Sequence, residues 1–339
     1  METFYHLAKI MTSSQRQALV KARQLHISCI IPVLNEAEGI ADFLRALHQQ
    51  VAALSDHFEI IVIDDGSTDQ TVAVLESLQA ELNLKVVVFS RNFGKANALT
   101  AGLAYSKGDV TIIMDADFQH PLELMPTFVE KWIEGFDVVY GIRKDRRGDS
   151  FFRRLTSGAF YTLMKWLSKA PILPNVVDYR LLDRRVVAAL NQFDERDRFM
   201  QGLFSWVGFQ RIAIPFIVPQ RRAGKSSWKL RKLTGLALTG LISFSEMPLR
   251  IWSLIGLIIS SAAFIYALYV LLRTLIFGVD LPGFATIVIA IMFFGGIQLM
   301  SIGILGEYIG RVFREVKRRP HYLVARQLGF EDTEHDRHD

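Results

Sequence analysis

The sequence predicts an α/β domain built on a mostly parallel sheet flanked by helices, followed by an interfacial amphipathic helix and two transmembrane helices. Three observations support this fold class. Short β-rich apolar runs alternate with helical segments as far as Arg143, two long charge-free stretches lie near the C-terminus, and 50% of the 339 residues are hydrophobic. Strand–helix alternation is typical of parallel sheets with helices on both faces, and about 20 apolar residues let a helix cross a bilayer.

Five apolar runs are expected to form strands, with helices between them. The expected strands are 28–33, 59–63, 85–89, 110–114 and 137–140, and the expected helices lie near 36–54, 69–82, 94–106 and 121–134. In open α/β sheets, ligands bind outside the carboxyl ends of the strands. The polar residues that follow each run are therefore the candidates for a functional site.

A distinct polar motif follows each expected strand. The motifs are PVLNE at 32–36, DDGS at 64–67, RNFGK at 91–95, DADFQHP at 115–121 and GIR at 141–143. A dinucleotide-binding fold needs Gly-x-Gly-x-x-Gly after its first strand, and this chain has PVLNE there. A P-loop is also absent from the sequence, so the two commonest nucleotide sites are excluded.

Asp115 and Asp117 flank one small residue at the end of the fourth expected strand. Residues two apart in an extended segment point to the same side, so both carboxylates can face one site. Carboxylate oxygens suit Mg²⁺ or Mn²⁺, and Gln119 could add a neutral oxygen. A lone Asp-x-Asp is more often a solvated turn, and DDGS is an ordinary turn signal. The case rests on both motifs occurring at strand ends of one sheet.

Two charge-free stretches, 251–272 and 281–306, are long enough to cross a bilayer. We expect membrane spans at about 249–273 and 281–306, which form a hairpin over 249–306; the alternative is two buried helices of a soluble bundle. Basic residues gather before the first span and after the second, whereas the connecting loop has Arg273 against Asp280. This bias places both ends of the hairpin at the cytoplasm.

The remaining boundaries follow from composition. Residues 1–26 form an N-terminal extension without the apolar core of a signal peptide, and residues 27–228 form the cytosolic α/β domain. Apolar residues at helical spacing predict an amphipathic interfacial helix over 229–248, with an ordinary packing helix as the alternative. Residues 307–339 are expected to form a basic cytoplasmic segment and a disordered acidic tail.

Together the motifs resemble the family 2 glycosyltransferases of the GT-A fold. They look most like the polyprenyl-phosphate glycosyltransferases, the group of dolichol-phosphate mannose synthase and bactoprenol glucosyltransferase. The resemblance runs from residue 27 to residue 322. Besides the strand-end motifs, it is carried by DYRLLDR at 178–184, RFMQGLFSWVGF at 198–209, RRAGKSSW at 221–228, SFSEMPLR at 243–250 and LGEYIGR at 305–311. Each piece is weak alone, but their shared order is a strong signal.

The resemblance implies a role for each matching residue. The catalytic residues would be Asp115, Asp117, Arg143 and Asp178. The nucleotide sugar would be bound by Pro32, Asn35, Glu36, Asp64, Asp65, Lys95, Asp115, Ala116, Asp117, Arg221 and Lys225. Arg143, Arg153 and Ser157 would grip the acceptor phosphate, and Asp115, Asp117 and Gln119 would hold Mg²⁺ or Mn²⁺. Ser227 stands where the family usually has a basic residue, so Lys225 or Lys229 would supply that charge.

The implied reaction is transfer of a hexose from a nucleotide sugar to undecaprenyl phosphate, giving a lipid-linked sugar for modification of cell-envelope glycans. Glucose from UDP-glucose is the first choice; mannose from GDP-mannose and aminoarabinose from its UDP donor are alternatives. A lipid monophosphate is mostly dianionic near neutrality, because its second pKa is about 6. It can attack without a general base, which predicts inversion without a covalent intermediate.

The resemblance also implies a setting. The chain would be a multi-pass protein of the bacterial inner membrane, with its catalytic domain and both termini in the cytoplasm. Its partners would be the nucleotide sugar, polyprenyl phosphate, membrane lipids, a separate flippase, a downstream transferase and a second copy of itself, but no nucleic acid. A processive polysaccharide synthase is an alternative, but residues 201–206 read QGLFSW and lack the Arg of Gln-x-x-Arg-Trp. A non-catalytic membrane scaffold is disfavoured because the metal and basic motifs are intact.

Overall fold

A computed structural model describes residues 23–144, 176–196, 198–217, 247–277 and 283–330 of the chain. These residues form two compact units. The first is the α/β domain, and it includes residues 320–330 from the end of the chain. The second contains two long helices. The N-terminal extension before residue 23, the tail after residue 330 and most of the expected interfacial helix lie outside the described residues.

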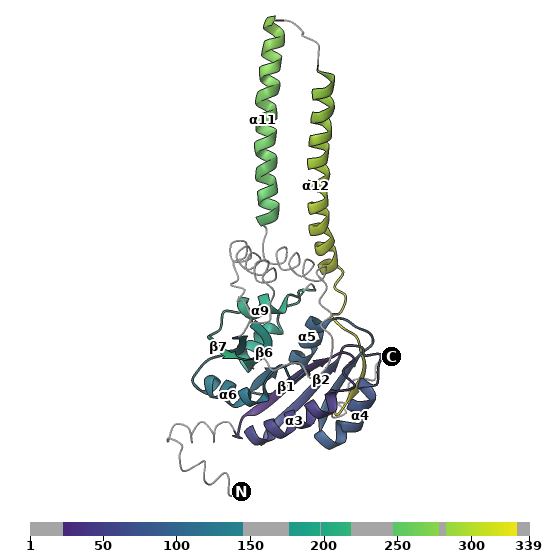
Figure 1. The fold of residues 1–339 in the computed structure, drawn as a ribbon, viewed down its shortest axis with the longest axis vertical. Coiled ribbons are helices and arrows are strands. Elements are labelled where there is room, and N and C mark those ends of the chain that lie inside the picture. The colour runs from purple at the N-terminus through teal and green to yellow at the C-terminus, as the bar shows by residue number, and fades with distance from the viewer. Residues whose placement is uncertain (1–22, 145–175, 197, 218–246, 278–282, 331–339) are drawn as a thin grey trace. The chain divides into compact units, whose positions relative to one another are not determined.

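The described residues of the α/β unit form one sheet of eight strands in the order β7-β5-β6-β4-β1-β2-β3-β8 (Figure 1). The central strands β4, β1, β2 and β3 run parallel to one another. The strands are β1 (His26–Val33), β2 (His57–Asp64), β3 (Leu84–Phe89), β4 (Val110–Ile113), β5 (Val138–Arg143), β6 (Val176–Asp183), β7 (Arg211–Phe216) and β8 (Val324–Leu328). The five strands expected from the sequence are all present, and the sheet is mostly parallel.

Three strands were not anticipated. β6 pairs antiparallel with both β4 and β5, β7 pairs parallel with β5, and β8 pairs antiparallel with β3. β6 lies between β4 and β5, so its residues reach the same sheet edge as the DADFQHP motif. This is how residues near 178 come to lie beside residues near 115.

Helices cover both faces of the sheet (Figure 1). Ile27, Cys29 and Ile31 of β1 belong to the core that includes α3 and α4, whereas Ile30 belongs to the core that includes α5. This alternation is the pattern of a strand buried on both faces. The helices of this unit are α3 (Ile40–Leu54), α4 (Thr71–Leu82), α5 (Lys95–Tyr105), η1 (Leu122–Leu124), α6 (Met125–Ile133), α8 (Arg184–Leu190) and α9 (Met200–Trp206).

The end of the chain returns to the α/β unit. Residues 320–330 belong to that unit, and β8 forms its edge strand beside β3. The boundary expected from the sequence lies at residue 228, with residues 307–339 in a cytoplasmic segment outside the domain. The domain is therefore discontinuous in sequence, and its sheet is completed by residues that follow the long helices.

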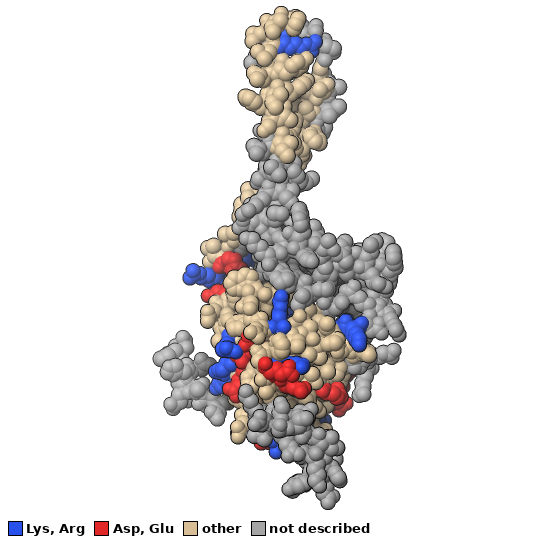
Figure 2. Space-filling model, turned by 90° about the vertical axis from the view of Figure 1, so that its left-hand side faces the viewer, with Lys and Arg blue, Asp and Glu red and all other residues tan. Residues whose placement is uncertain are grey.

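The second unit contains α11 (Met247–Phe277) and α12 (Phe284–Val316), which lie side by side. In Figure 2 the described side chains in the upper part of this unit are uncharged, apart from a basic group near the tip. Within the described residues, the segment Phe293–Val316 is long and apolar enough to cross a membrane, judged by length and composition. A second span stays a prediction. α12 also continues past residue 306, where the expected span ends, as far as Val316.

Candidate functional site

A cavity of about 310 Å³ opens at the carboxyl ends of β1, β2 and β4. It is the place where an open α/β sheet binds its ligands. Seven of the predicted nucleotide-sugar residues line it: Pro32, Glu36, Asp65, Lys95, Asp115, Ala116 and Asp117. Sequence analysis missed five other lining residues, which are Val33, Leu34, Asn92, Gly94 and Ala98. Most of them are apolar or glycine residues next to predicted residues. No chemical property of their side chains pointed to a site, so only their place in the sequence could have identified them.

Lys95 joins two of the predicted catalytic carboxylates. It is the first residue of α5, and its Nζ lies 2.6 Å from Asp115 Oδ1 and 3.0 Å from Asp178 Oδ2. Burial opposes the charge on Lys95, but Asp178 and Asp115 outweigh it and raise the Lys95 pKa. Burial likewise disfavours the charged form of Asp178, but Lys95 and Arg180 outweigh it and lower the Asp178 pKa. Lys95 and Asp178 are therefore both charged near neutral pH.

The turn after β4 orients the Asp-x-Asp motif. The N–H of Asp115 donates to His120 Nδ1 at 3.0 Å, and the N–H of Gln119 donates to Asp117 Oδ1 at 3.1 Å. Phe118 between them has a φ of 55°, in the left-handed region that tight turns use. These hydrogen bonds hold both ends of the motif. The side chains of Asp115 and Asp117 therefore both project from this one turn toward the cavity.

His120 is a buried support for this turn that sequence analysis missed. Its ring stacks on Tyr179 with centroids 5.0 Å apart and 13° between planes. Burial lowers the His120 pKa to about 4, so the ring is neutral at pH 7 and Nδ1 can accept the Asp115 N–H. Tyr179 in turn donates its hydroxyl to the carbonyl of Pro121 at 2.9 Å. β6 therefore supports the motif as well as contributing Asp178.

The donor set fits a hard divalent cation shared with an oxygen-rich ligand. Asp115 and Asp117 supply carboxylate oxygens at the cavity, and such oxygens are the ligands that Mg²⁺ and Mn²⁺ prefer. Within the described residues no cluster of three or more His, Cys, Asp or Glu could hold a metal. Gln119, the third predicted ligand, accepts a hydrogen bond at Oε1 from Arg143 Nη2 at 3.3 Å. Further oxygens must then come from the bound ligand or water.

Asp65 ties the end of β2 to the loop before α5. Its carboxylate accepts the N–H of Phe93 at 2.7 Å and the N–H of Gly94 at 2.9 Å. The neighbouring Gly66 has a φ of +71°, and a Cβ there would come within 2.3 Å of the Arg91 backbone. Only glycine fits this close approach, so the DDGS motif is packed against the RNFGK motif.

Two residues predicted to contact the nucleotide bind backbone instead. Asp64 is fully buried at 0% exposure, and its Oδ2 accepts the N–H of Ser67 at 3.0 Å. Asn35, at a φ of 55°, accepts the N–H of Thr68 at its Oδ1 at 2.8 Å. Neither lines the cavity. In this structure they shape the loops from which Asp65 and Glu36 reach it.

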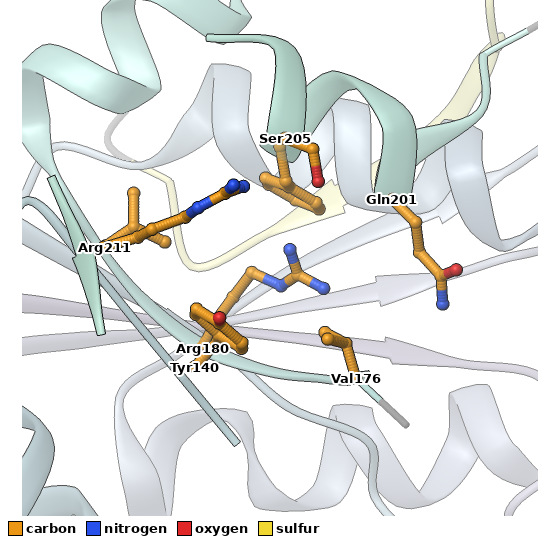
Figure 3. Close-up of a pocket in the computed structure, with 8 residues that line it drawn as sticks. Tyr140, Val176, Arg180, Gln201, Ser205 and Arg211 are labelled. Carbon is orange, nitrogen blue, oxygen red and sulfur yellow. The ribbon is translucent and has the colours of Figure 1, made fainter. Parts of the chain in front are cut away.

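Arg180 anchors Asp178 from behind. It is 3% exposed, lies 3.4 Å from Asp178 Oδ1, and its guanidinium carbon sits 3.8 Å from the centre of the Phe204 ring. Figure 3 shows Arg180 beside a small cavity of about 20 Å³, with Gln201 and Ser205 of α9 on one side and Arg211 of β7 on another. That volume holds about one water molecule. The cavity is too small for a sugar or a nucleotide, so Arg180 serves to fix Asp178.

Four predicted residues lie outside the described residues. These are the acceptor-phosphate residues Arg153 and Ser157 and the loop residues Arg221 and Lys225. Arg143, the third acceptor-phosphate residue, ends β5 and contacts Gln119. The structure thus brings seven of the eleven predicted nucleotide-sugar residues together at the cavity, and Arg143 reaches the DADFQHP motif from β5.

The model of glycosyl transferase family 2 matches residues 28–190. A prophage bactoprenol glucosyl transferase homolog of Escherichia coli K12 is 42% identical over 303 residues, covering 89% of this chain and 99% of that protein. The bactoprenol glucosyl transferase of Shigella phage SfII is 41% identical over 303 residues, covering 89% and 98%. An uncharacterized glycosyltransferase of Synechocystis is 42% identical over 308 residues, covering 91% and 97%.

The chain therefore belongs to glycosyl transferase family 2, and it is a glycosyltransferase. Its α/β unit has the mostly parallel, GT-A-like arrangement that the motifs imply. The match to these relatives extends well beyond the family model, because it covers about nine-tenths of the chain.

Proposed function

We propose that the enzyme transfers a hexosyl residue, glucose from UDP-glucose as the first choice, to a polyprenyl phosphate such as undecaprenyl phosphate. The observation that carries the proposal is the near full-length match to proteins named bactoprenol glucosyl transferase, at 41–42% identity. The cavity supports it, since Asp65, Lys95, Asp115 and Asp117 suit the ribose and diphosphate of a nucleotide sugar. Mannose and aminoarabinose are the alternative sugars.

The residues of the cavity would act on the leaving diphosphate. A divalent cation held by Asp115 and Asp117 would supply neutralisation of its negative charge. The Lys95 side chain lies beside Asp115 and is 44% exposed. Its ammonium can therefore donate to a diphosphate oxygen as well as to the two carboxylates. Asp178 and Arg180 would keep Lys95 in place. Fixed charge of this kind stabilises a leaving group at no cost of reorganisation.

The acceptor supplies its own nucleophile. A phosphate monoester has a second pKa of about 6, so one of its oxygens is ready to attack at pH 7. In the proposed step that oxygen forms a bond to the anomeric carbon, the bond from that carbon to the diphosphate oxygen breaks, and the nucleoside diphosphate leaves with the electron pair. A single displacement inverts the anomeric configuration. Arg143 stands at the edge of the site where it can meet the acceptor phosphate.

The proposal is tested with membranes from cells that express the full chain. They are incubated with undecaprenyl phosphate and radiolabelled UDP-glucose, GDP-mannose or UDP-aminoarabinose, with and without EDTA. We expect label in the lipid fraction from UDP-glucose, loss of that label with EDTA, and recovery when Mg²⁺ or Mn²⁺ is added in excess. Asp117→Asn keeps the shape of the side chain but removes its charge, and it should abolish labelling.

Each part of the proposal has its own contrary outcome. Label entering lipid only from another donor would overturn the glucose assignment. Labelling of the lipid that survives both EDTA and Asp117→Asn would overturn the metal role. No labelling of lipid from any donor, with the purified chain folded, would overturn the polyprenyl phosphate acceptor. A product that keeps the α-configuration of the donor would overturn single displacement.

A further inference from the structure

Residues 320–330 pack against the strand and loop that lead into the cavity. The ring of Tyr322 stacks on Phe89 with centroids 4.8 Å apart and 11° between planes. Beside it, the carbonyl of Leu323 accepts the N–H of Ser90 at 2.9 Å. Phe89 in turn meets the ring of Phe93 edge-on at 5.8 Å. The returning segment is thus joined to the loop between β3 and α5 through both backbone and side chains.

That loop positions two residues that line the cavity, Asp65 and Lys95. The N–H groups of Phe93 and Gly94 hold the carboxylate of Asp65 at 2.7 and 2.9 Å. Gly94 also caps the N-terminus of α5 at a φ of 95°, and Lys95 follows it as the first helical residue. A shift of Phe93 would therefore move the anchor of Asp65 and the starting point of Lys95 together.

We propose that Tyr322 is a positioning residue for the donor site. It does not line the cavity; it acts by stacking on Phe89, whose ring meets Phe93 edge-on. Aromatic pairs at these distances and angles stabilise one relative orientation beyond the area that they bury. The three packed rings of Tyr322, Phe89 and Phe93 therefore hold the loop in the position where its amides bind Asp65 and where Lys95 faces Asp115. The identity of the ligand that this loop serves rests on the proposed function.

The rival explanation is that the segment only covers the exposed edge of β3. The two explanations can be distinguished because a second aromatic residue, Phe330, follows the other end of β8. Phe330 contacts Tyr105 with centroids 5.2 Å apart and has the Lys85 ammonium 5.8 Å from its ring centre. Phe330 and Tyr322 are both half-buried members of the same apolar cluster. Loss of either ring weakens edge cover, whereas only loss of Tyr322 frees the loop.

Hydrogen exchange measures the loop directly and needs no substrate. The full chain in detergent is compared with Tyr322→Ala, Tyr322→Phe and Phe330→Ala by exchange of peptides that cover residues 90–95. In Tyr322→Ala we expect exchange about two- to tenfold faster, which corresponds to the usual strength of an aromatic pair. Tyr322→Phe keeps the ring and should restore the wild-type rate, and Phe330→Ala should exchange at that rate too. Tyr322→Leu replaces Tyr322→Ala if the alanine variant does not fold.

Kinetics give the second readout. With polyprenyl phosphate saturating, Tyr322→Ala should raise the KM for the nucleotide sugar by about the same two- to tenfold while kcat changes less. Unchanged exchange in Tyr322→Ala and Tyr322→Leu would overturn the inference. Equal acceleration in Tyr322→Ala and Phe330→Ala would overturn it as well, because that is the result of edge cover. If the wild type transfers no sugar, the proposed function fails, but the exchange experiment still decides the role of Tyr322.

Discussion

Lys95 is the residue on which the charges of the site converge. Its ammonium lies between Asp115, which follows β4, and Asp178, which belongs to β6. An ammonium has three donors, so two carboxylates leave one donor for a ligand. With 44% of the Lys95 side chain exposed, that donor is accessible from the cavity. Lys95 can thus hold Asp115 and Asp178 in place and bind a ligand at the same time.

Replacement of Lys95 should be costly to the reaction. We expect Lys95→Met to lower kcat/KM for the nucleotide sugar by about 10²- to 10³-fold, which is the usual loss when one fixed donor to a developing negative charge is removed. Steady-state labelling of lipid measures the change. Lys131→Met is the matched control, since Lys131 of α6 forms an ion pair with Glu134, just after the helix, and neither lines the cavity. A Lys95→Met enzyme with wild-type kcat/KM would contradict this role.

At the scale of residues, the sequence predicted the charged groups that line the cavity better than the groups that support them. Asp65, Lys95, Asp115 and Asp117 stand at strand ends, where the topology of the sheet alone marks a site. His120 and Tyr179 could not be found in this way, because they are brought together by β6, whose pairing with β4 is not local in sequence. Asp64 shows the opposite limit: both neighbouring carboxylates are buried, and adjacency does not reveal that only Asp65 lines the cavity.

At the scale of elements, Glu59 connects the first three strands. Its Oε1 accepts from Ser28 of β1 at 2.5 Å and from the N–H of Lys107 at 2.7 Å, while its Oε2 accepts from Lys85 of β3 at 2.6 Å. Burial opposes the charge on Glu59, but the hydrogen bonds from Lys85, Ser28 and Lys107 outweigh it and lower its pKa. A lowered pKa in the folded state means that the ionised form stabilises the fold.

The stability that Glu59 contributes should depend on pH. It is fully present above the unfolded pKa of about 4.3 and is lost as the pH falls through the lower pKa of the folded state. We expect Glu59→Gln to reduce the free energy of unfolding by about 1–3 kcal/mol at pH 7 and by progressively less below about pH 4. Denaturant titration of the detergent-solubilised chain across this range measures both effects.

Glu81 provides the control for this experiment. Its ion pair with Arg45 is exposed on both sides, and exposed pairs contribute little. Glu81→Gln should leave the unfolding midpoint unchanged at pH 7. If Glu59→Gln lowered the free energy of unfolding by the same amount down to pH 3, Glu59 would stabilise the fold through its shape rather than its charge.

The elements that the sequence did not reveal share a physical reason. β1 to β4 are buried on both faces and appear as continuous apolar runs, whereas β8 reads Val-Ala-Arg-Gln-Leu and is partly exposed. An edge strand with polar residues carries no signal above that of a loop. β6 contains Asp178 and Arg180, and these residues drew attention as motif members rather than as part of a strand.

At the scale of the whole molecule, the two long helices are the basis of the proposed location. The proposed location is the inner membrane, with two spans and both termini in the cytoplasm. Alkaline phosphatase inserted at residues 278–282 should then be active, because the connection between the helices would face the periplasm, and the same enzyme fused after residue 339 should be inactive. After an alkaline carbonate wash, the full chain should remain in the membrane pellet. Active phosphatase at the C-terminus would contradict this topology.

The return of residues 320–330 to the sheet has a consequence for biosynthesis. Chains emerge from the ribosome N-terminus first, at about 5–20 residues per second. The partner strands β8 and β3 are separated by both long helices, so the β3 edge stays open for roughly tens of seconds after β3 itself has been made. During that interval Phe89 lacks the ring of Tyr322. If Tyr322 positions the loop as proposed, the nascent chain completes the cavity only after α11 and α12 have been synthesised, and activity appears last.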